Sequence, residues 1–184
     1  GQAYGERVKT MQWLARQGCE VTCYGAKWPQ GRVSYHEMLG VYKQSLLNLN
    51  FSASSATWSL RSLGRLLANK QHGKLCLVSP WRWFDTARSE YARITKKQIK
   101  GRVFEVVAAG GFLLTEYVAG LEHYFEPGRE IAVFTSRADL LEKIRYYSAH
   151  PQEVAVCRER AYQRLCAEHT YEQRFLSIFK QMGL

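Results

Sequence analysis

The stretch that most constrains the fold is residues 100–125, which read KGRVFEVVAAGGFLLTEYVAGLEHYF. Residues 101–109 have a helical pattern, and Gly110 and Gly111 end it. The apolar run 112–115 follows at once and is typical of a buried strand. A helix that turns back directly into a buried strand predicts an α/β unit.

The rest of the chain extends this pattern into an α/β fold. We predict a Rossmann-like parallel sheet with helices on both faces and extra C-terminal helices, the last of which wraps over another surface. Ser34 with Glu37, and Thr170 with Gln173, match the capping-box pattern at helix starts. The expected helices span 5–17, 35–43, 101–109, 119–124, 136–149, 151–167 and a segment after Thr170, and the expected strands span 19–24, 45–51, 112–115 and 130–134.

Length and composition favour one domain over residues 1–184. The chain has 184 residues, 46% of them hydrophobic and 23% charged, as in globular proteins. No apolar run approaches the roughly 20 residues that cross a membrane, and the N-terminus lacks the apolar core of a signal peptide. We therefore expect a cytoplasmic protein. The start, a glycine-rich turn leading into a helix, suggests a piece of a longer protein cut just after a strand.

Positive charge is concentrated in one segment. Residues 58–102 hold eleven Lys and Arg against two acidic residues, a net of +9 out of +10 for the chain. Residues 53–99 also interrupt the α/β order and are predicted to be a basic insertion, with a helix over 57–69 and a strand over 73–80. Such a segment favours an anionic partner, such as phosphates, nucleic acid or a membrane surface that the protein contacts peripherally. A solvated, solubilising face is the alternative.

Cysteine and histidine spacing indicates no metal site. The five cysteines form no CxxC pair, and the five histidines form no HExxH pair. We expect buried thiols in a reducing compartment.

Three blocks of sequence resemble the spore-maturation-type (CgeB-like) glycosyltransferases of the GT-B superfamily. The first block is KGRVFE with AAGGFLLTE in 100–116, and the second is GLE with YFEPGRE in 120–130. The third lies in the C-terminal part of the chain and consists of HP at 150–151 and HTY at 169–171. The resemblance implies the C-terminal, donor-binding domain of a glycosyltransferase. The donor is then a nucleotide diphosphate-sugar, no cofactor is needed, and a separate N-terminal domain holds the acceptor.

The resemblance also assigns roles to individual residues. Related retaining enzymes carry an E-x7-E motif, and Glu105 falls on its second position, which contacts the ribose, while Lys97 stands at the first. Arg102 shares the helix face of Glu105 and suits the phosphates, with Lys100 as a further candidate. Pairing between Glu105 and Arg102 is the structural alternative. No catalytic residue is assigned, and the stereochemical outcome stays open.

Three further residues are candidates for the donor site. Gly110 and Gly111 permit close approach of a ligand to the backbone, although a tight helix–strand turn also explains them. Glu116 follows the strand and either lines the cleft or is a solvated carboxylate.

Two other functions remain open at this point. The +9 segment, with its interleaved aromatic residues, is also typical of a nucleic-acid-binding module. Lys97 at the first E-x7-E position is also compatible with a non-catalytic scaffold that kept the GT-B fold. For the glycosyltransferase, we expect the isolated chain to bind donor without turnover, because the acceptor domain is absent.

Overall fold

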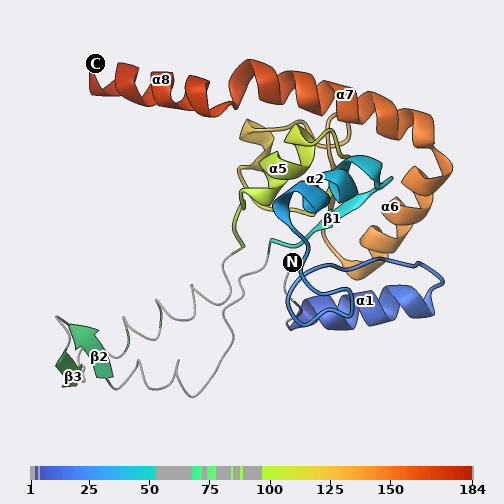
Figure 1. Cartoon of the computed structure of the whole chain (residues 1–184), viewed down its shortest axis with the longest axis horizontal. Coiled ribbons are helices and arrows are strands. Elements are labelled where there is room, and N and C mark those ends of the chain that lie inside the picture. Colours follow the sequence, from blue (N-terminus) through green and yellow to red (C-terminus); the bar gives the residue numbers. More distant parts are fainter. Residues whose placement is uncertain are drawn as a thin grey trace. The chain divides into compact units, whose positions relative to one another are not determined.

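The computed structural model describes residues 3, 5–52, 68–71, 74–77, 84, 88 and 97–183 (Figure 1). The chain forms two compact units. The first unit combines Gly1–Ser52 with Ile99–Leu184, and the second is Ala53–Gln98. The second unit covers nearly the same residues as the predicted insertion.

A parallel sheet of three strands forms the centre of the first unit. The strands are β1 (Asn48–Asn50), β4 (Leu113–Glu116) and β5 (Ala132–Phe134), in the order β1-β4-β5. β4 lies in the middle and pairs in parallel with both neighbours. This arrangement confirms the predicted α/β fold with a parallel sheet.

The helices of the first unit follow the predicted order along the chain. Their bounds are α1 (Glu6–Arg16), α2 (Tyr35–Gln44), α5 (Arg102–Ala108), the 3-10 helix η2 (Leu121–His123), α6 (Arg137–Ala149), α7 (Pro151–Glu168) and α8 (Tyr171–Met182). Both predicted capping boxes are present, at Ser34 with Glu37 and at Thr170 with Gln173. They satisfy backbone N–H groups that the first turn of a helix leaves without partners.

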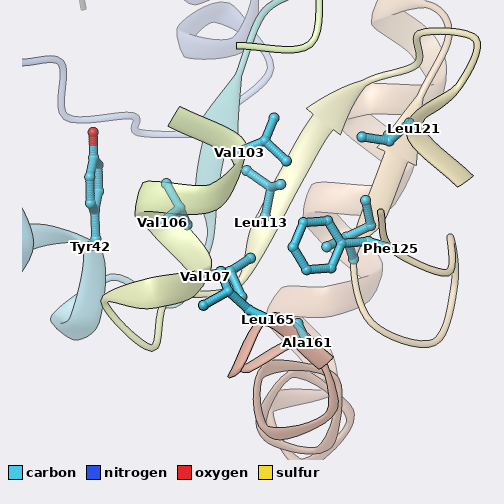
Figure 2. Packing of buried hydrophobic residues seen from close by; sticks show 10 residues of the cluster. Tyr42, Val103, Val106, Val107, Leu113, Leu121, Phe125, Ala161 and Leu165 are labelled. Atoms are coloured by element: carbon cyan, nitrogen blue, oxygen red, sulfur yellow. The ribbon is translucent and has the colours of Figure 1, made fainter. Parts of the chain in front are cut away.

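Helices cover both faces of the sheet. Consecutive side chains of β4 point to opposite faces, so β4 contributes to a core on each face. Leu113 packs into a core with the α5 valines and with Leu165 of α7, as Figure 2 shows. Leu114 packs on the other side, in a core that contains Leu14 of α1 and Leu140 of α6. Such double coverage is what parallel sheets require.

The strand predicted over residues 19–24 is wrong. These residues are not hydrogen-bonded into the sheet, although their exposure roughly alternates along the segment. Cys19 and Val21 still pack against the core that contains Leu14. Alternating side chains indicate a half-buried extended segment, but a strand also needs a neighbouring backbone, which sequence alternation does not report.

The second unit contains an antiparallel pair, β2 (Ala68–Gln71) and β3 (Lys74–Leu77). The predicted helix over 57–69 is wrong at its end, since Ala68 and Asn69 belong to β2. The rest of that helix lies outside the described residues. The predicted strand over 73–80 is confirmed for Lys74–Leu77.

The last helix, α8, continues beyond α7 (Figure 1). Among the described residues, none of its side chains is buried. Near its start the Arg174 guanidinium lies 4.4 Å from the ring centre of Phe104 and 5.6 Å from that of Tyr124. These contacts join the start of α8 to the rest of the unit. No helix in the described part of the chain is long and apolar enough to cross a membrane.

Candidate functional site

Polar bonds join the carboxyl ends of β1 and β4. The backbone N–H of Ser52 donates to Oε2 of Glu116 over 3.0 Å, and the Ser52 hydroxyl donates to the Glu116 carbonyl, also over 3.0 Å. Two residues before Ser52 and one before Glu116, Nδ2 of Asn50 donates to Oγ1 of Thr115 over 2.9 Å. In open parallel sheets, this carboxyl edge is where ligands bind.

Two basic side chains converge on one carbonyl at this edge. Nη2 of Arg7 donates to the Phe51 carbonyl over 3.0 Å, and Nζ of Lys100 donates to the same oxygen over 3.3 Å. Arg7 comes from the first turn of α1, whereas Lys100 precedes α5. The fold thus brings together cations that are far apart in sequence.

The pKa of Lys100 reports the charge around it. Partial burial lowers the pKa of this ammonium, and repulsion from Arg7 and Arg102 lowers it further, while the Glu116 carboxylate acts in the opposite direction. We call Arg7, Lys100, Arg102 and Glu116 the carboxyl-edge cluster. It holds three positive charges for one negative charge, and a bound anion would relieve the repulsion between the cations.

Arg102 and Glu105 both lie near the Tyr42 hydroxyl. Burial raises the pKa of Tyr42, the nearby Arg102 guanidinium lowers it through its charge and a hydrogen bond, and Glu105 raises it. The Glu105 carboxylate folds back towards the start of α5, since a Cβ added to Gly101 would lie 3.9 Å from its Oε1. The structure therefore places Glu105 beside Arg102, at the border of the carboxyl-edge cluster.

The Nε–H group of Arg102 has no hydrogen-bond acceptor among the described residues. Its nitrogen is buried. A buried N–H without a partner is costly, and such groups in folded proteins commonly bind a ligand or water. Nitrogens of Arg164 and Arg174, outside the cluster, share this state, so the Arg102 N–H can bind a ligand or water but does not by itself mark the site.

Gly110 and Gly111 lie at the opposite, amino end of β4. Gly110 has a φ of 73° and ends α5 in a left-handed conformation. A Cβ on Gly111 would lie 2.6 Å from the Tyr42 carbonyl oxygen and 2.7 Å from Nδ2 of Asn48. The helix–strand turn and this close packing account for both glycines, and the structure does not bring either to the carboxyl-edge cluster.

Sequence reasoning missed two residues of this site, Arg7 and Ser52. Arg7 carried a signal, because a basic residue in the first turn of a helix opposes the helix dipole and so invites another explanation. Ser52 carried none, since its role depends on the pairing of β1 with β4. Among the described residues no group of three His, Cys, Asp or Glu side chains is arranged to hold a metal ion.

Residues 7–180 match the sequence family described as glycosyl transferase-like. The chain belongs to this family. No curated protein and no solved structure matches the chain. The match runs from Arg7 to within α8, so it includes all four members of the carboxyl-edge cluster. In a parallel sheet such as this one, the carboxyl edge is the candidate ligand site.

Proposed function

We propose that this domain binds a nucleotide diphosphate-sugar at the carboxyl-edge cluster and supplies its sugar to an acceptor. The observation that carries the proposal is the convergence of Arg7 and Lys100 on the Phe51 carbonyl, with Arg102 close enough for its charge to lower the pKa of Lys100. A diphosphate is the part of such a donor that requires several cations at once. Membership in the glycosyl transferase-like family supports the same chemistry.

In the proposed complex the three cations bind the diphosphate. Sugar transfer forms a bond between an acceptor atom and the anomeric carbon, releases the acceptor's proton, and breaks the bond between that carbon and a diphosphate oxygen. The departing diphosphate oxygen keeps the electron pair and gains negative charge. Preorganised cations stabilise this charge more in the transition state than in the bound donor. The Arg102 Nε, buried and without an acceptor in the described chain, supplies one further N–H donor.

Glu105 is proposed to accept hydrogen bonds from the ribose hydroxyls. The Glu105 carboxylate lies beside Arg102. One nucleotide diphosphate-sugar can therefore contact the cations with its diphosphate and Glu105 with its ribose. Glu116 is already bonded to Ser52, and we propose that it joins the strand ends and balances the charge of Lys100 rather than contacting the donor. The two glycines at the other end of β4 are left out of the proposed site.

We further propose that the domain is the donor half of a GT-B, CgeB-like enzyme, and that the acceptor binds to a separate domain. On this view the isolated chain binds donor without transferring sugar. Lys97 is exposed and stands eight residues before Glu105, where related retaining enzymes carry a glutamate. The proposal therefore names no catalytic residue and no stereochemical outcome.

Calorimetric titration with UDP, GDP and ADP tests donor binding. We expect one of them to bind, and we expect Arg102→Ala to weaken binding about tenfold or more, as for loss of a charged hydrogen bond. Arg160→Ala is the matched control, because Arg160 is exposed on α7 and this substitution removes the same charge. Equal weakening in both variants would mean that only net charge matters.

A nucleotide without ribose hydroxyls isolates the role of Glu105. The 2′,3′-dideoxy form of the preferred nucleotide should bind the wild-type chain less tightly than the parent nucleotide. In Glu105→Gln the difference between the two nucleotides should largely disappear, as a double-mutant cycle requires of interacting groups. If the variant retains the full difference, Glu105 does not contact the ribose. If no nucleotide binds to the wild-type chain, the non-catalytic scaffold is the better interpretation.

A further inference from the structure

Tyr42 links the packed helices to the carboxyl-edge cluster. The residue lies in α2 and is only 9% exposed. Its ring packs in the core that contains the α5 valines Val103, Val106 and Val107. In Figure 2 its hydroxyl points towards Val103, at the start of α5, and away from Val107. The hydroxyl therefore lies near the end of α5 that carries Arg102.

The backbone that carries Tyr42 is held in place from the sheet and from α7. Nδ2 of the buried Asn48 donates to the Tyr42 carbonyl over 2.9 Å and to the Phe112 carbonyl over 3.3 Å. At the next residue along α2, Nη2 of Arg158 donates to the Lys43 carbonyl over 3.0 Å. Two successive carbonyls of α2 are thus bonded to other elements, so the fold sets the position of the Tyr42 side chain.

The Tyr42 hydroxyl is bonded to Arg102. A hydrogen bond joins the two side chains, and because an arginine side chain only donates, the phenol oxygen is the acceptor. Burial raises the pKa of Tyr42, which keeps the phenol neutral. A neutral phenol keeps its own proton, so the hydroxyl can also donate to an acceptor beside Arg102.

Tyr42 and Arg102 line one groove. This groove has a volume of about 660 Å³, lies beside β1, and is also lined by Arg7. Two cations of the carboxyl-edge cluster and the side chain that bonds one of them therefore face the same space. An arginine that is not held in place loses rotamer freedom when it binds a ligand, and this loss weakens binding. A hydrogen bond from a buried phenol reduces that loss.

We propose that Tyr42 is a positioning residue of the donor site, whose hydroxyl holds the Arg102 guanidinium in the orientation that binds the diphosphate. The inference rests on the proposed function. Tyr42 acts through Arg102 and needs no contact with the donor of its own. The packing of α2 against α5 is then part of the binding site, because it delivers the hydroxyl to Arg102.

The test compares two substitutions that each remove one hydroxyl from α2. Tyr42→Phe keeps the ring in the core and removes the partner of Arg102. Tyr35→Phe is the matched control, because Tyr35 is the first residue of the same helix and is 66% exposed.

The first measurement needs no ligand. Nuclear magnetic resonance of the Nη hydrogens of Arg102 follows rotation of the guanidinium in the free chain. We expect Tyr42→Phe to speed this rotation about tenfold, as for loss of one hydrogen bond to a charged group, and Tyr35→Phe to leave it unchanged.

The second measurement is calorimetric titration with whichever of UDP, GDP and ADP binds the wild-type chain. We expect Tyr42→Phe to weaken binding about tenfold and Tyr35→Phe to leave it unchanged. In an Arg102→Ala background, Tyr42→Phe should weaken binding no further, because its effect passes through Arg102. A merely structural role of Tyr42 would weaken binding equally in both backgrounds.

Three results would overturn the proposal. The first is unchanged rotation of the Arg102 guanidinium in Tyr42→Phe. The second is equal affinity of Tyr42→Phe and the wild type for the nucleotide. The third is the same loss of affinity with and without Arg102. If Tyr42→Phe frees the guanidinium but no nucleotide binds to the wild-type chain, Tyr42 holds Arg102 as inferred, and the failure lies with the proposed function.

Discussion

The two ends of the α5–β4 unit have opposite characters. At the amino end of β4 the chain is closely packed, and Nδ2 of Asn48 donates to the Tyr42 carbonyl over 2.9 Å in the space beside Gly111. At the carboxyl end, the charges of Arg7 and Arg102 repel the Lys100 ammonium beside the end of β1. One end is arranged for packing, and the other holds excess positive charge at some cost to stability. That difference separates residues that hold the fold from residues available to a ligand.

The largest expected effect is on stability, at the packed end. Gly111→Ala would place its Cβ 2.6 Å from a backbone oxygen, so that backbone must move. We expect a loss of about 3 kcal/mol in the free energy of unfolding, measured by urea denaturation. Gly40→Ala is the control, because a Cβ there meets nothing within 4 Å. It should stabilise α2 by roughly 0.5–1 kcal/mol. Equal stability of wild type and Gly111→Ala would contradict the packing argument.

The next effect is on binding, at the charged end. Arg7→Ala should weaken nucleotide diphosphate binding about tenfold, because it removes a cation that the fold holds beside Lys100. Calorimetry measures this, and raising the salt concentration should reduce the difference between variant and wild type. If Arg7→Ala binds the nucleotide diphosphate as tightly as the wild type, Arg7 does not take part in binding it.

The smallest effect concerns the pH dependence of stability. The pKa of Lys100 is lowered in the folded chain, so just below the ordinary lysine pKa of about 10.4 the unfolded chain binds more protons. Stability should therefore rise with pH in that window, and Lys100→Gln should remove this contribution.

Urea denaturation of both proteins from about pH 8 to pH 11 measures the difference. At neutral pH the variant should be as stable as the wild type or slightly more stable, because it lacks a cation that its neighbours repel. A variant that is clearly less stable at neutral pH would show that Lys100 stabilises the fold.

Local signals in the sequence predicted most of the fold. The capping boxes at Ser34 and Thr170 and the glycines after α5 act within a few residues, so the sequence displays them directly. The strand expected over 19–24 failed because pairing depends on a neighbour elsewhere in the chain. The end of the helix expected over 57–69 failed for a related reason, since Ala68 and Asn69 pair with β3.

The candidate site was only partly predictable. Lys100, Arg102 and Glu105 are close in sequence, so the sequence predicts them as one group, and the structure keeps them close together. The conformational freedom of Gly110 and Gly111 makes them candidates from sequence alone, yet the direction of β4 places them at the other end of the strand. The sequence alone does not predict that Arg7 lies beside Lys100. The two residues are far apart in the chain and meet only because the fold brings α1 and the segment before α5 to the end of β1.

Nuclear magnetic resonance of the isotope-labelled chain tests whether a nucleotide diphosphate binds at the carboxyl-edge cluster. The preferred nucleotide diphosphate is titrated, and the backbone amide signals at the two ends of β4 are compared. We expect shifts at Ser52, Gly101 and Arg102, around the carboxyl-edge cluster, and none at Gly110 and Gly111. Shifts confined to the two glycines, or to β2 and β3 in the second unit, would contradict binding at this cluster.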